Sequence, residues 1–194
     1  MNDTLLWYTT RGAGVVSMVL LSGVMALGML TRARAGGLRW PRFLTAALHR
    51  DLSLMALVFL ALHIVTAVVD PYTHLGITAA IIPFGSYYRT FWLGLGTVAL
   101  ELMLAVAATS LLRARIGQRA WRAVHWLAYG CWPIAIFHGL GTGTDAGSTW
   151  MSVTTVVCVA AVVAAGAFRL LSPGDPLGGE KRAAARRALT EPGR

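Results

Sequence analysis

Residues 48–63 read LHRDLSLMALVFLALH, an apolar stretch with a histidine near each end. This stretch belongs to a longer apolar run, from Phe43 to Val69, which is long enough for a helix to cross a bilayer core of about 30 Å. Backbone polar groups in lipid must form their hydrogen bonds internally, so such a run predicts a helix. Four other runs of similar length extend from Gly12 to Leu30, Phe91 to Leu112, Ala120 to Leu140 and Trp150 to Leu171. The sequence therefore predicts an all-α integral membrane protein, a bundle of about five transmembrane helices.

The composition supports this class and excludes others. Hydrophobic residues make up 56% of the 194 residues, charged residues make up 13%, and the mean hydropathy is +0.62. These values exclude a disordered chain and argue against an ordinary soluble domain. Cys131 and Cys158 form neither a CxxC pair nor a CxxCH motif, so no c-type haem attachment is expected, and we expect both thiols to be buried and inert.

The positions of the basic residues predict the orientation in the membrane. The net charge is +9, and all but two of the 17 Lys and Arg residues lie in three segments on one side of the predicted bundle. By the positive-inside rule, the N-terminus is outside and the C-terminus is cytoplasmic, as expected for a multi-pass protein of the inner (plasma) membrane. The cations therefore predict contact with the lipid bilayer and not with nucleic acid. Residues 1–171 are expected to form the membrane domain, and residues 172–194 a basic, flexible cytoplasmic tail.

Four of the five histidines lie within or at the edge of two predicted helices. His49 and His63 are 14 residues apart in the second helix, and His125 and His138 are 13 residues apart in the fourth. At 1.5 Å per residue these spacings correspond to about 21 and 20 Å. Because the two helices run in the same direction, we expect His49 to lie level with His125 near the cytoplasmic side, and His63 level with His138 near the outer side.

One imidazole from each of two facing helices is the ligand set of a b-type haem with two axial histidines. The sequence therefore predicts two b-type haems, with His49 and His125 on the inner iron and His63 and His138 on the outer iron. The directions of the side chains around each helix agree with this only in part. A spacing of 14 residues places His49 and His63 within about 40° of the same helix face, whereas a spacing of 13 residues places His125 and His138 about 140° apart. Either a bend at Pro133 or an offset between the two haems would accommodate this difference.

Other functions for these histidines stay open at this point. They would be structural if they only pack or form hydrogen bonds, but ionisable side chains inside a membrane are costly and usually functional. A haem-free proton channel or transporter that uses the histidines and Glu101 is the alternative of another class. The matched pairs, and the lack of internal repeats, argue against it. Two ligands at each level, without a cysteine or carboxylate, also fit a zinc site poorly.

Three stretches resemble the ferric reductase-like transmembrane domain family. They are LHRDLSLMALVFLALH (48–63), PFGSYYRTFWLGLG (83–96) and WRAVHWLAYGCWPIAIFHGLGTGTD (121–145), and the resemblance covers most of residues 5–145. The family includes the membrane haem domains of ferric reductases and NADPH oxidases, and the haem subunit of a bacterial methionine sulfoxide reductase system. The resemblance implies two haems on the same four histidines and electron transfer from the cytoplasmic side outward.

The sequence departs from this family in one respect, which concerns the electron donor. The oxidases and the eukaryotic reductases carry a flavin and nicotinamide domain after the last helix, and this sequence has no GxGxxG motif there. We therefore expect no FAD or NAD(P) site in this chain and a separate donor, either a cytoplasmic flavin reductase or membrane quinol. The expected acceptor is ferric iron, oxygen or a periplasmic redox protein. A reductase and a haem subunit that only serves a separate periplasmic partner both stay open.

Three arginines are candidates for binding the haem propionates, because a guanidinium forms paired hydrogen bonds with a carboxylate. Arg11 and Arg89 are expected near the outer histidines, where snorkelling to the membrane surface is the alternative. Arg50 directly follows His49 on the inner side, and Asp51 is its competing partner.

Two residues inside the predicted helices also have two interpretations each. Glu101 is expected either to carry protons or serve a quinol site, or to be protonated and bonded to a neighbouring helix. Trp132 lies between the two histidine levels, where it either shortens the electron path or packs in the bundle. The apolar loop segment ITAAIIPF (77–84) is expected to fold over the outer haem, and His74 is expected to be exposed.

Overall fold

The computed structural model describes residues 3–33, 42–71 and 75–172, and these residues form helices and no strand. Four of the helices are long and apolar enough to cross a membrane, namely α1, α2, α4 and α7. An all-α membrane bundle is therefore the class that the structure supports. The helices are α1 (Asp3–Ala33), α2 (Arg42–Val69), α3 (Gly76–Ile81), α4 (Thr90–Leu111), α5 (Arg113–His125), α6 (Ala128–Thr142) and α7 (Thr149–Leu171).

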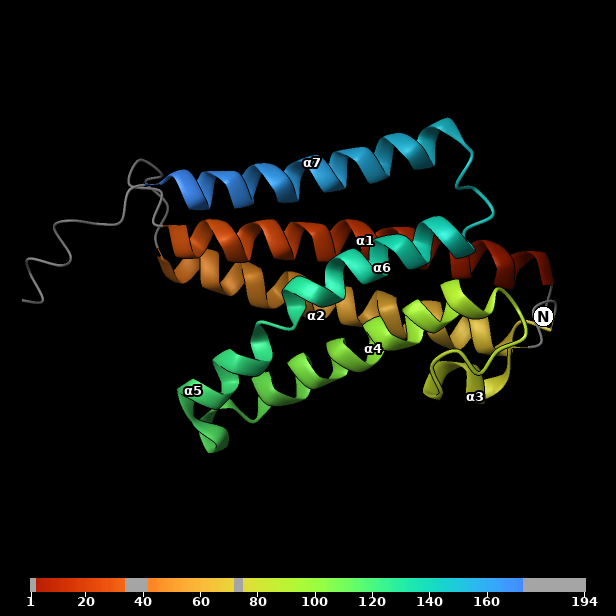
Figure 1. Cartoon of the computed structure of the whole chain (residues 1–194), viewed down its shortest axis with the longest axis horizontal. Coiled ribbons are helices and arrows are strands. Elements are labelled where there is room, and N and C mark those ends of the chain that lie inside the picture. Colours follow the sequence, from red (N-terminus) through yellow and green to blue (C-terminus); the bar gives the residue numbers. More distant parts are fainter. Residues whose placement is uncertain (1–2, 34–41, 72–74, 173–194) are drawn as a thin grey trace, which may run out of the picture.

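The helices pack as two groups (Figure 1). In the first group, α1 lies between α2 and α7 and packs against both. In the second group, α4 packs against α6 and α5. Helix α6 also contacts α1, and the short helix α3 contacts both α2 and α4. Helix α6 therefore joins the two groups along their length, and α3 joins them at one end.

The distribution of side-chain sizes is that of a bundle surrounded by lipid. The buried residues at the helix contacts are mostly small, and large apolar side chains point outward, such as Val58 on α2, which is 66% exposed. Small residues allow helices to approach closely where lipid gives no hydrophobic drive for them to associate. Examples of the buried small residues are Ala13, Ser17, Ala56, Ala99 and Cys131.

Two polar contacts hold α6 between its neighbours. The Cys131 thiol donates to the carbonyl of Ala99 on α4, with 3.2 Å between sulfur and oxygen. The Trp132 indole N–H donates to the Ser22 hydroxyl on α1 at 2.9 Å. Adjacent residues of α6 thus contact opposite groups of helices, so they fix the rotation of α6 about its axis.

The prediction of one continuous helix over residues 120–140 is wrong. The chain forms two helices there, because α5 ends at His125 and α6 begins at Ala128. In the turn between them, hydrogen bonds join residues three apart, the pattern of the tighter 3-10 helix. Pro133 lies inside α6, several residues after this turn. The N–H groups that bond to the carbonyl three residues earlier are those of Leu127, Tyr129 and Gly130.

This tighter turn reduces the phase difference between His125 and His138. A 3-10 turn advances about 120° per residue, against about 100° in an α-helix. Each residue in the tighter turn therefore adds about 20°, in the direction that reduces the roughly 140° by which 13 α-helical residues miss a common face. The turn at Trp126 and Leu127, which the sequence did not predict, thus helps to bring the two histidines toward the same side.

The other four predicted spans agree with helices, although α1 begins well before Gly12 and continues past Leu30. The predicted basic tail, residues 172–194, lies outside the described residues apart from Ser172. Part of the first basic segment, which includes Arg34 and Arg39, and the loop residue His74 also lie outside them.

Candidate functional site

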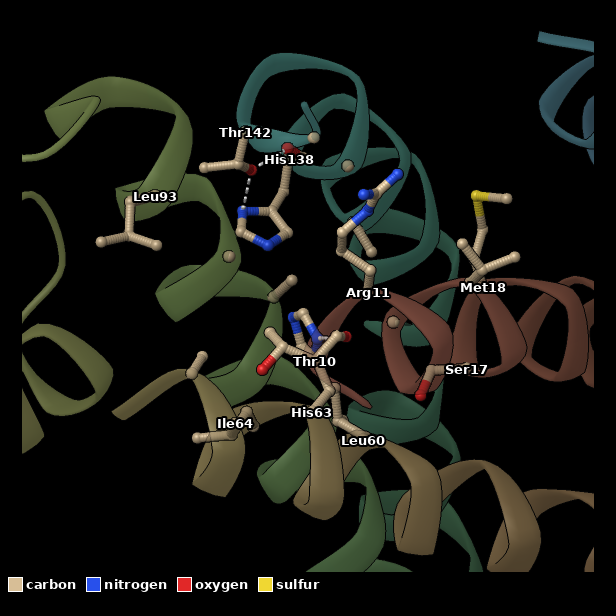
Figure 2. A pocket seen from close by; sticks show the side chains of 18 of the residues that line it. Thr10, Arg11, Ser17, Met18, Leu60, His63, Ile64, Leu93, His138 and Thr142 are labelled. Carbon is tan, nitrogen blue, oxygen red and sulfur yellow. Dashed lines mark hydrogen bonds between the residues drawn. The ribbon is translucent and has the colours of Figure 1, made fainter. Parts of the chain in front are cut away.

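His63 on α2 and His138 on α6 face each other across the bundle (Figure 2). Their ring centroids are 6.4 Å apart and the ring planes are inclined by 76°. We call these two residues the outer pair. His63 Nδ1 lies 2.8 Å from the carbonyl oxygen of Thr10, and His138 Nδ1 lies 2.9 Å from that of Trp92. A carbonyl can only accept, so these contacts assign the proton of each neutral ring to Nδ1 and leave a lone pair on Nε2. His138 Nδ1 also lies 3.1 Å from the Thr142 hydroxyl oxygen, which can accept from the same N–H (Figure 2).

His49 on α2 and His125 at the end of α5 form a second pair with the same separation. Their ring centroids are also 6.4 Å apart, with the planes inclined by 65°. We call these residues the inner pair. The Nδ1 atoms of both rings are buried and have no hydrogen-bond partner in the described part of the chain. The Trp121 indole stacks on the His125 ring at 5.0 Å between centroids.

The two pairs lie at two levels of the bundle. His49 and His63 share one continuous helix, and 14 residues of α-helix span about 21 Å. The segment from His125 to His138 runs between the same two levels, since each of its ends meets a histidine of α2. The structure therefore brings together all four histidines that the sequence singled out, in the pairs expected from their depths.

The spacing within each pair fits two axial ligands of one iron. An imidazole nitrogen lies about 2 Å from a bound metal and the ring centre about 1 Å further, so two rings on opposite sides of one ion have centroids about 6 Å apart. The ring centroids are 6.4 Å apart in both pairs. Among the described residues no group of three or more His, Cys, Asp or Glu side chains could hold a metal ion. Each pair therefore offers two imidazole nitrogens and no third protein ligand among the described residues.

The space beside the outer pair is a mainly apolar cavity that several helices line. Its walls include Leu60 and Ile64 of α2, Leu93 and Met103 of α4, and Ile136 of α6. Figure 2 shows His63 and His138 directed into it from opposite sides. Ala79 of α3 and Leu75, just before that helix, also line the cavity, and the Thr97 hydroxyl of α4 donates to the Ala79 carbonyl at 2.8 Å. The segment that we expected to cover the outer level therefore lies beside this cavity.

Arg11 borders the same cavity and forms an ion pair with Asp145, in the segment after α6. Its guanidinium also lies over the Trp7 ring, 3.8 Å from the centroid. Both charged side chains are only about a quarter exposed, at 24% and 23%. The sequence predicted Arg11 near the outer histidines but gave no indication of this partner, because the two residues are distant along the chain.

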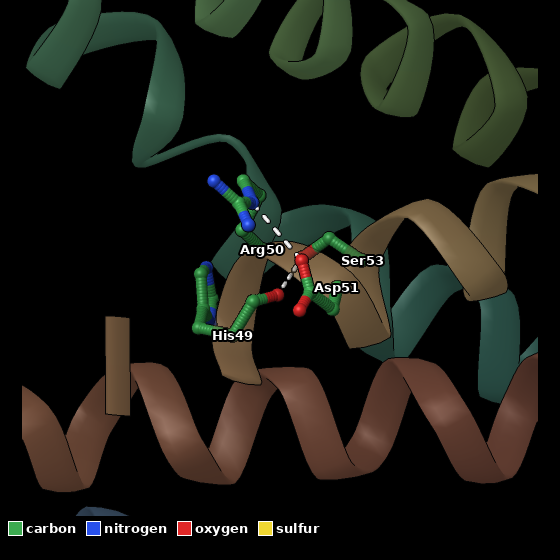
Figure 3. Close-up of polar contacts among 4 residues, drawn as sticks. All are labelled: His49, Arg50, Asp51 and Ser53. Carbon is green, nitrogen blue, oxygen red and sulfur yellow. Dashed lines mark hydrogen bonds and ion pairs between the residues drawn. The ribbon is translucent and has the colours of Figure 1, made fainter. Parts of the chain in front are cut away.

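The other two candidate arginines have partners within the chain. Arg89 donates from Nη1 to the carbonyl of Gly141, which ties the start of α4 to the end of α6. Arg50 pairs with the adjacent Asp51 at 3.0 Å, and both side chains are largely exposed (Figure 3). Of the two partners considered for Arg50, the structure therefore shows Asp51.

Glu101 is exposed on the outer side of α4. Within residues 3–33, 42–71 and 75–172 it has neither a hydrogen bond nor an ion pair, so the expected bond to a neighbouring helix does not form. Trp132 is half-buried between the two histidine levels and its indole is bound to Ser22. Both cysteines are free and buried, as expected.

The fold and the paired histidines define a class, an all-α membrane bundle with two interhelical histidine pairs. Residues 5–145 match the model of a family described as a domain of unknown function (DUF8596), and the chain belongs to that family. The matched region contains all four paired histidines and ends at Asp145, before α7. No curated protein and no solved structure matches the chain.

Replacing Asp145 with asparagine is expected to lower the free energy of unfolding by about 1–2 kcal/mol, because the half-buried Arg11 charge loses its partner. Thermal unfolding in detergent measures this as a fall of a few degrees in Tm. The matched control is Asp51→Asn, which breaks the exposed Arg50 pair and should leave Tm nearly unchanged. Equal shifts for the two variants would contradict the structural role of the Arg11–Asp145 pair.

Proposed function

We propose that this protein binds two b-type haems, one on each histidine pair, and carries electrons across a membrane. The observation that supports the proposal best concerns the two interhelical histidine pairs. The ring centroids are 6.4 Å apart in each pair, and the members that lie on α2, His49 and His63, are 14 residues apart. Two pairs of equal spacing, at two depths of a membrane bundle, suit two metal centres in series.

The proposed orientation places the outer pair near the outside of the cell and the inner pair near the cytoplasm. We count the segment from His125 to His138 as a membrane crossing, because it runs between the same levels as residues 49–63 of α2. This gives five crossings, with the N-terminus outside. The arginines of α5 then lie on the cytoplasmic side, as the positive-inside rule requires.

Each part of the proposed site has a task that its own residues can perform. When bound, haem supplies one-electron chemistry, with a potential set by its ligands and surroundings. His63 and His138 would hold one iron through Nε2, and His49 and His125 would hold the other through a ring nitrogen of each. The apolar walls around the outer pair limit the access of water, and residues of α3 and of the segment after α6 border that cavity.

We propose a cytoplasmic flavin reductase or membrane quinol as the donor, and ferric iron or a periplasmic redox protein as the acceptor. The resemblance to ferric reductase-like membrane domains supports this direction of transfer. Arg11 lies next to the outer cavity and is the arginine best placed to meet a haem carboxylate there, in exchange for Asp145.

Sealed vesicles test the transfer of electrons. The haem-loaded protein is reconstituted with ferricyanide trapped inside and dithionite added outside, and loss of the ferricyanide absorbance is followed. We expect fast reduction with the wild type, and only the rate of protein-free vesicles with His63→Ala, which breaks the outer pair. If wild-type protein with both haems bound is no faster than protein-free vesicles, the proposal is wrong.

A further inference from the structure

Two of the four paired histidines, those of the outer pair, face the same local arrangement on a neighbouring helix. A backbone carbonyl and a glycine four residues later lie against the imidazole ring. Thr10 and Gly14 of α1 face His63, and Trp92 and Gly96 of α4 face His138. Gly28 of α1 also lies against the His49 ring, but His49 Nδ1 has no hydrogen-bond partner among the described residues.

Helix geometry explains why the fourth residue after the carbonyl has to be glycine. Each carbonyl accepts one hydrogen bond from the N–H four residues later and keeps a second lone pair that points outward. The Cβ of that later residue tilts toward the helix N-terminus, so it lies over the carbonyl. Without a Cβ, the carbonyl is open to a donor from another helix.

The space at each glycine is occupied by the histidine ring itself. A Cβ added at Gly96 would lie 2.5 Å from His138 Nδ1, and one added at Gly14 would lie 2.9 Å from His63 Nδ1. At Gly28 the nearest atom would be His49 Cε1 at 3.3 Å. The first two distances are too short for any real contact, and the third is tight. Alanine should therefore be tolerated least at Gly96 and best at Gly28.

Other glycines on the same helix lack this contact. A Cβ at Gly12 or Gly23 of α1 would meet nothing within 4 Å. Inside a helix, glycine is less favourable than alanine by up to about 1 kcal/mol. Helix propensity therefore gives no reason for glycine, either at the positions that face a histidine ring or at Gly12 and Gly23. Gly14 and Gly28 are 14 residues apart, the same spacing as His49 and His63 on the antiparallel helix α2.

We propose that Gly14 and Gly96 are positioning residues, each of which uncovers a backbone carbonyl for the Nδ1–H of a histidine of the outer pair. The hydrogen bond fixes the ring and its tautomer, so that Nε2 points toward the opposite histidine. This inference rests on the proposed function, because a fixed Nε2 lone pair serves a histidine that binds a metal.

The arrangement is stronger at the outer pair than at the inner pair. Both outer rings have hydrogen bonds of normal length to carbonyls, whereas His49 Nδ1 has no hydrogen-bond partner among the described residues. His125 has no such glycine and instead stacks on Trp121. Loss of an outer hydrogen bond should therefore weaken binding more than a change at Gly28.

Haem titration of the haem-free protein tests the effect on binding. We expect Gly96→Ala and Gly14→Ala each to weaken binding at the outer pair by about 10–100-fold, the usual cost of losing a hydrogen bond to a metal ligand. Gly28→Ala should have a smaller effect at the inner pair. The matched controls Gly12→Ala and Gly23→Ala should bind as the wild type does. Equal losses in the controls, or no loss with Gly96→Ala, would overturn the proposal.

A second measurement needs no haem and separates the two proposals. Nitrogen NMR of haem-free protein with labelled histidine reports which ring nitrogen carries the proton, and His63→Asn and His138→Asn assign the signals. We expect both outer rings to be protonated at Nδ1, and Gly14→Ala to change only the His63 signal. If the tautomers behave so but the wild type binds no haem, the positioning role is upheld and the electron-transfer proposal fails. If haem binds and Gly14→Ala leaves His63 unchanged, the positioning role fails.

Discussion

Replacing His63 with alanine is expected to reduce the haem content of the purified protein from two per chain to one. The remaining imidazole of the outer pair, His138, can supply only one axial ligand, and no other described histidine lines the cavity. The inner pair lies about 21 Å away along α2 and should keep its haem. Haem extraction and counting, with the absorption spectrum of the reduced protein, measures the loss.

Because two histidines are assigned to each haem, the single and double variants of a pair should lose the same haem. His138→Ala should give the same one-haem protein, and the double variant with His63→Ala should lose no more than either single variant. The corresponding changes at His49 and His125 should remove the other haem. His74→Ala changes the one histidine outside the pairs and is the control. A haem content of two in any of the four single variants would contradict the assigned ligands.

Inserting one alanine after Leu127 is expected to remove the inner haem and leave the outer one. The insertion rotates α5 relative to α6 by about 100°. Helix α6 should keep its place, because Cys131 and Trp132 bond to two different helices and Ile136 is buried. Helix α5 has no buried residue, so it should yield, and His125 should leave His49.

Two further variants identify which haem remains after the insertion. Adding His63→Ala should remove the remaining haem, whereas adding His49→Ala should change nothing. An alanine inserted after Gly147, in the exposed segment before α7, is the control and should leave both haems. Two bound haems in the Leu127 insertion would show that the turn does not set the position of His125.

Much of the fold could be predicted because lipid restricts what an apolar run can form. Four of the five predicted spans correspond to α1, α2, α4 and α7, whose length and apolar character are properties of each run alone. The depths of the histidines also follow from position along a helix. The separation of 6.4 Å within each pair then depends on how α2 and α6 are placed, which no single run determines.

The turn between α5 and α6 could not be predicted from local sequence. Residues 120–140 are apolar enough for one helix, and Pro133 was the only visible reason for a bend. The structure instead has 3-10 hydrogen bonds at Leu127. This turn depends on contacts between helices, because it helps both His125 and His138 to reach the histidines of α2. The Arg11–Asp145 pair was hidden for a similar reason, since it joins two segments that only the folded bundle brings together.

The glycines that face the histidines of α2 left a signal in the sequence that could have been found. Gly14 and Gly28 repeat the spacing of His63 and His49 on the next helix, in reverse order along the chain. Two antiparallel helices with matched spacings bring each glycine level with one histidine. Gly96 left no such signal, because its histidine is on α6, whose phase depends on the turn at Leu127.

The central claim is that each histidine pair binds one b-type haem, and one spectrum tests it most directly. The wild-type protein is purified, supplied with haem and measured as dithionite-reduced minus oxidised absorption, with the haem counted per chain. The account predicts two low-spin haems with two axial histidines each. Folded protein that takes up no haem, or that takes it up only in a high-spin form with an open axial position, would contradict the account.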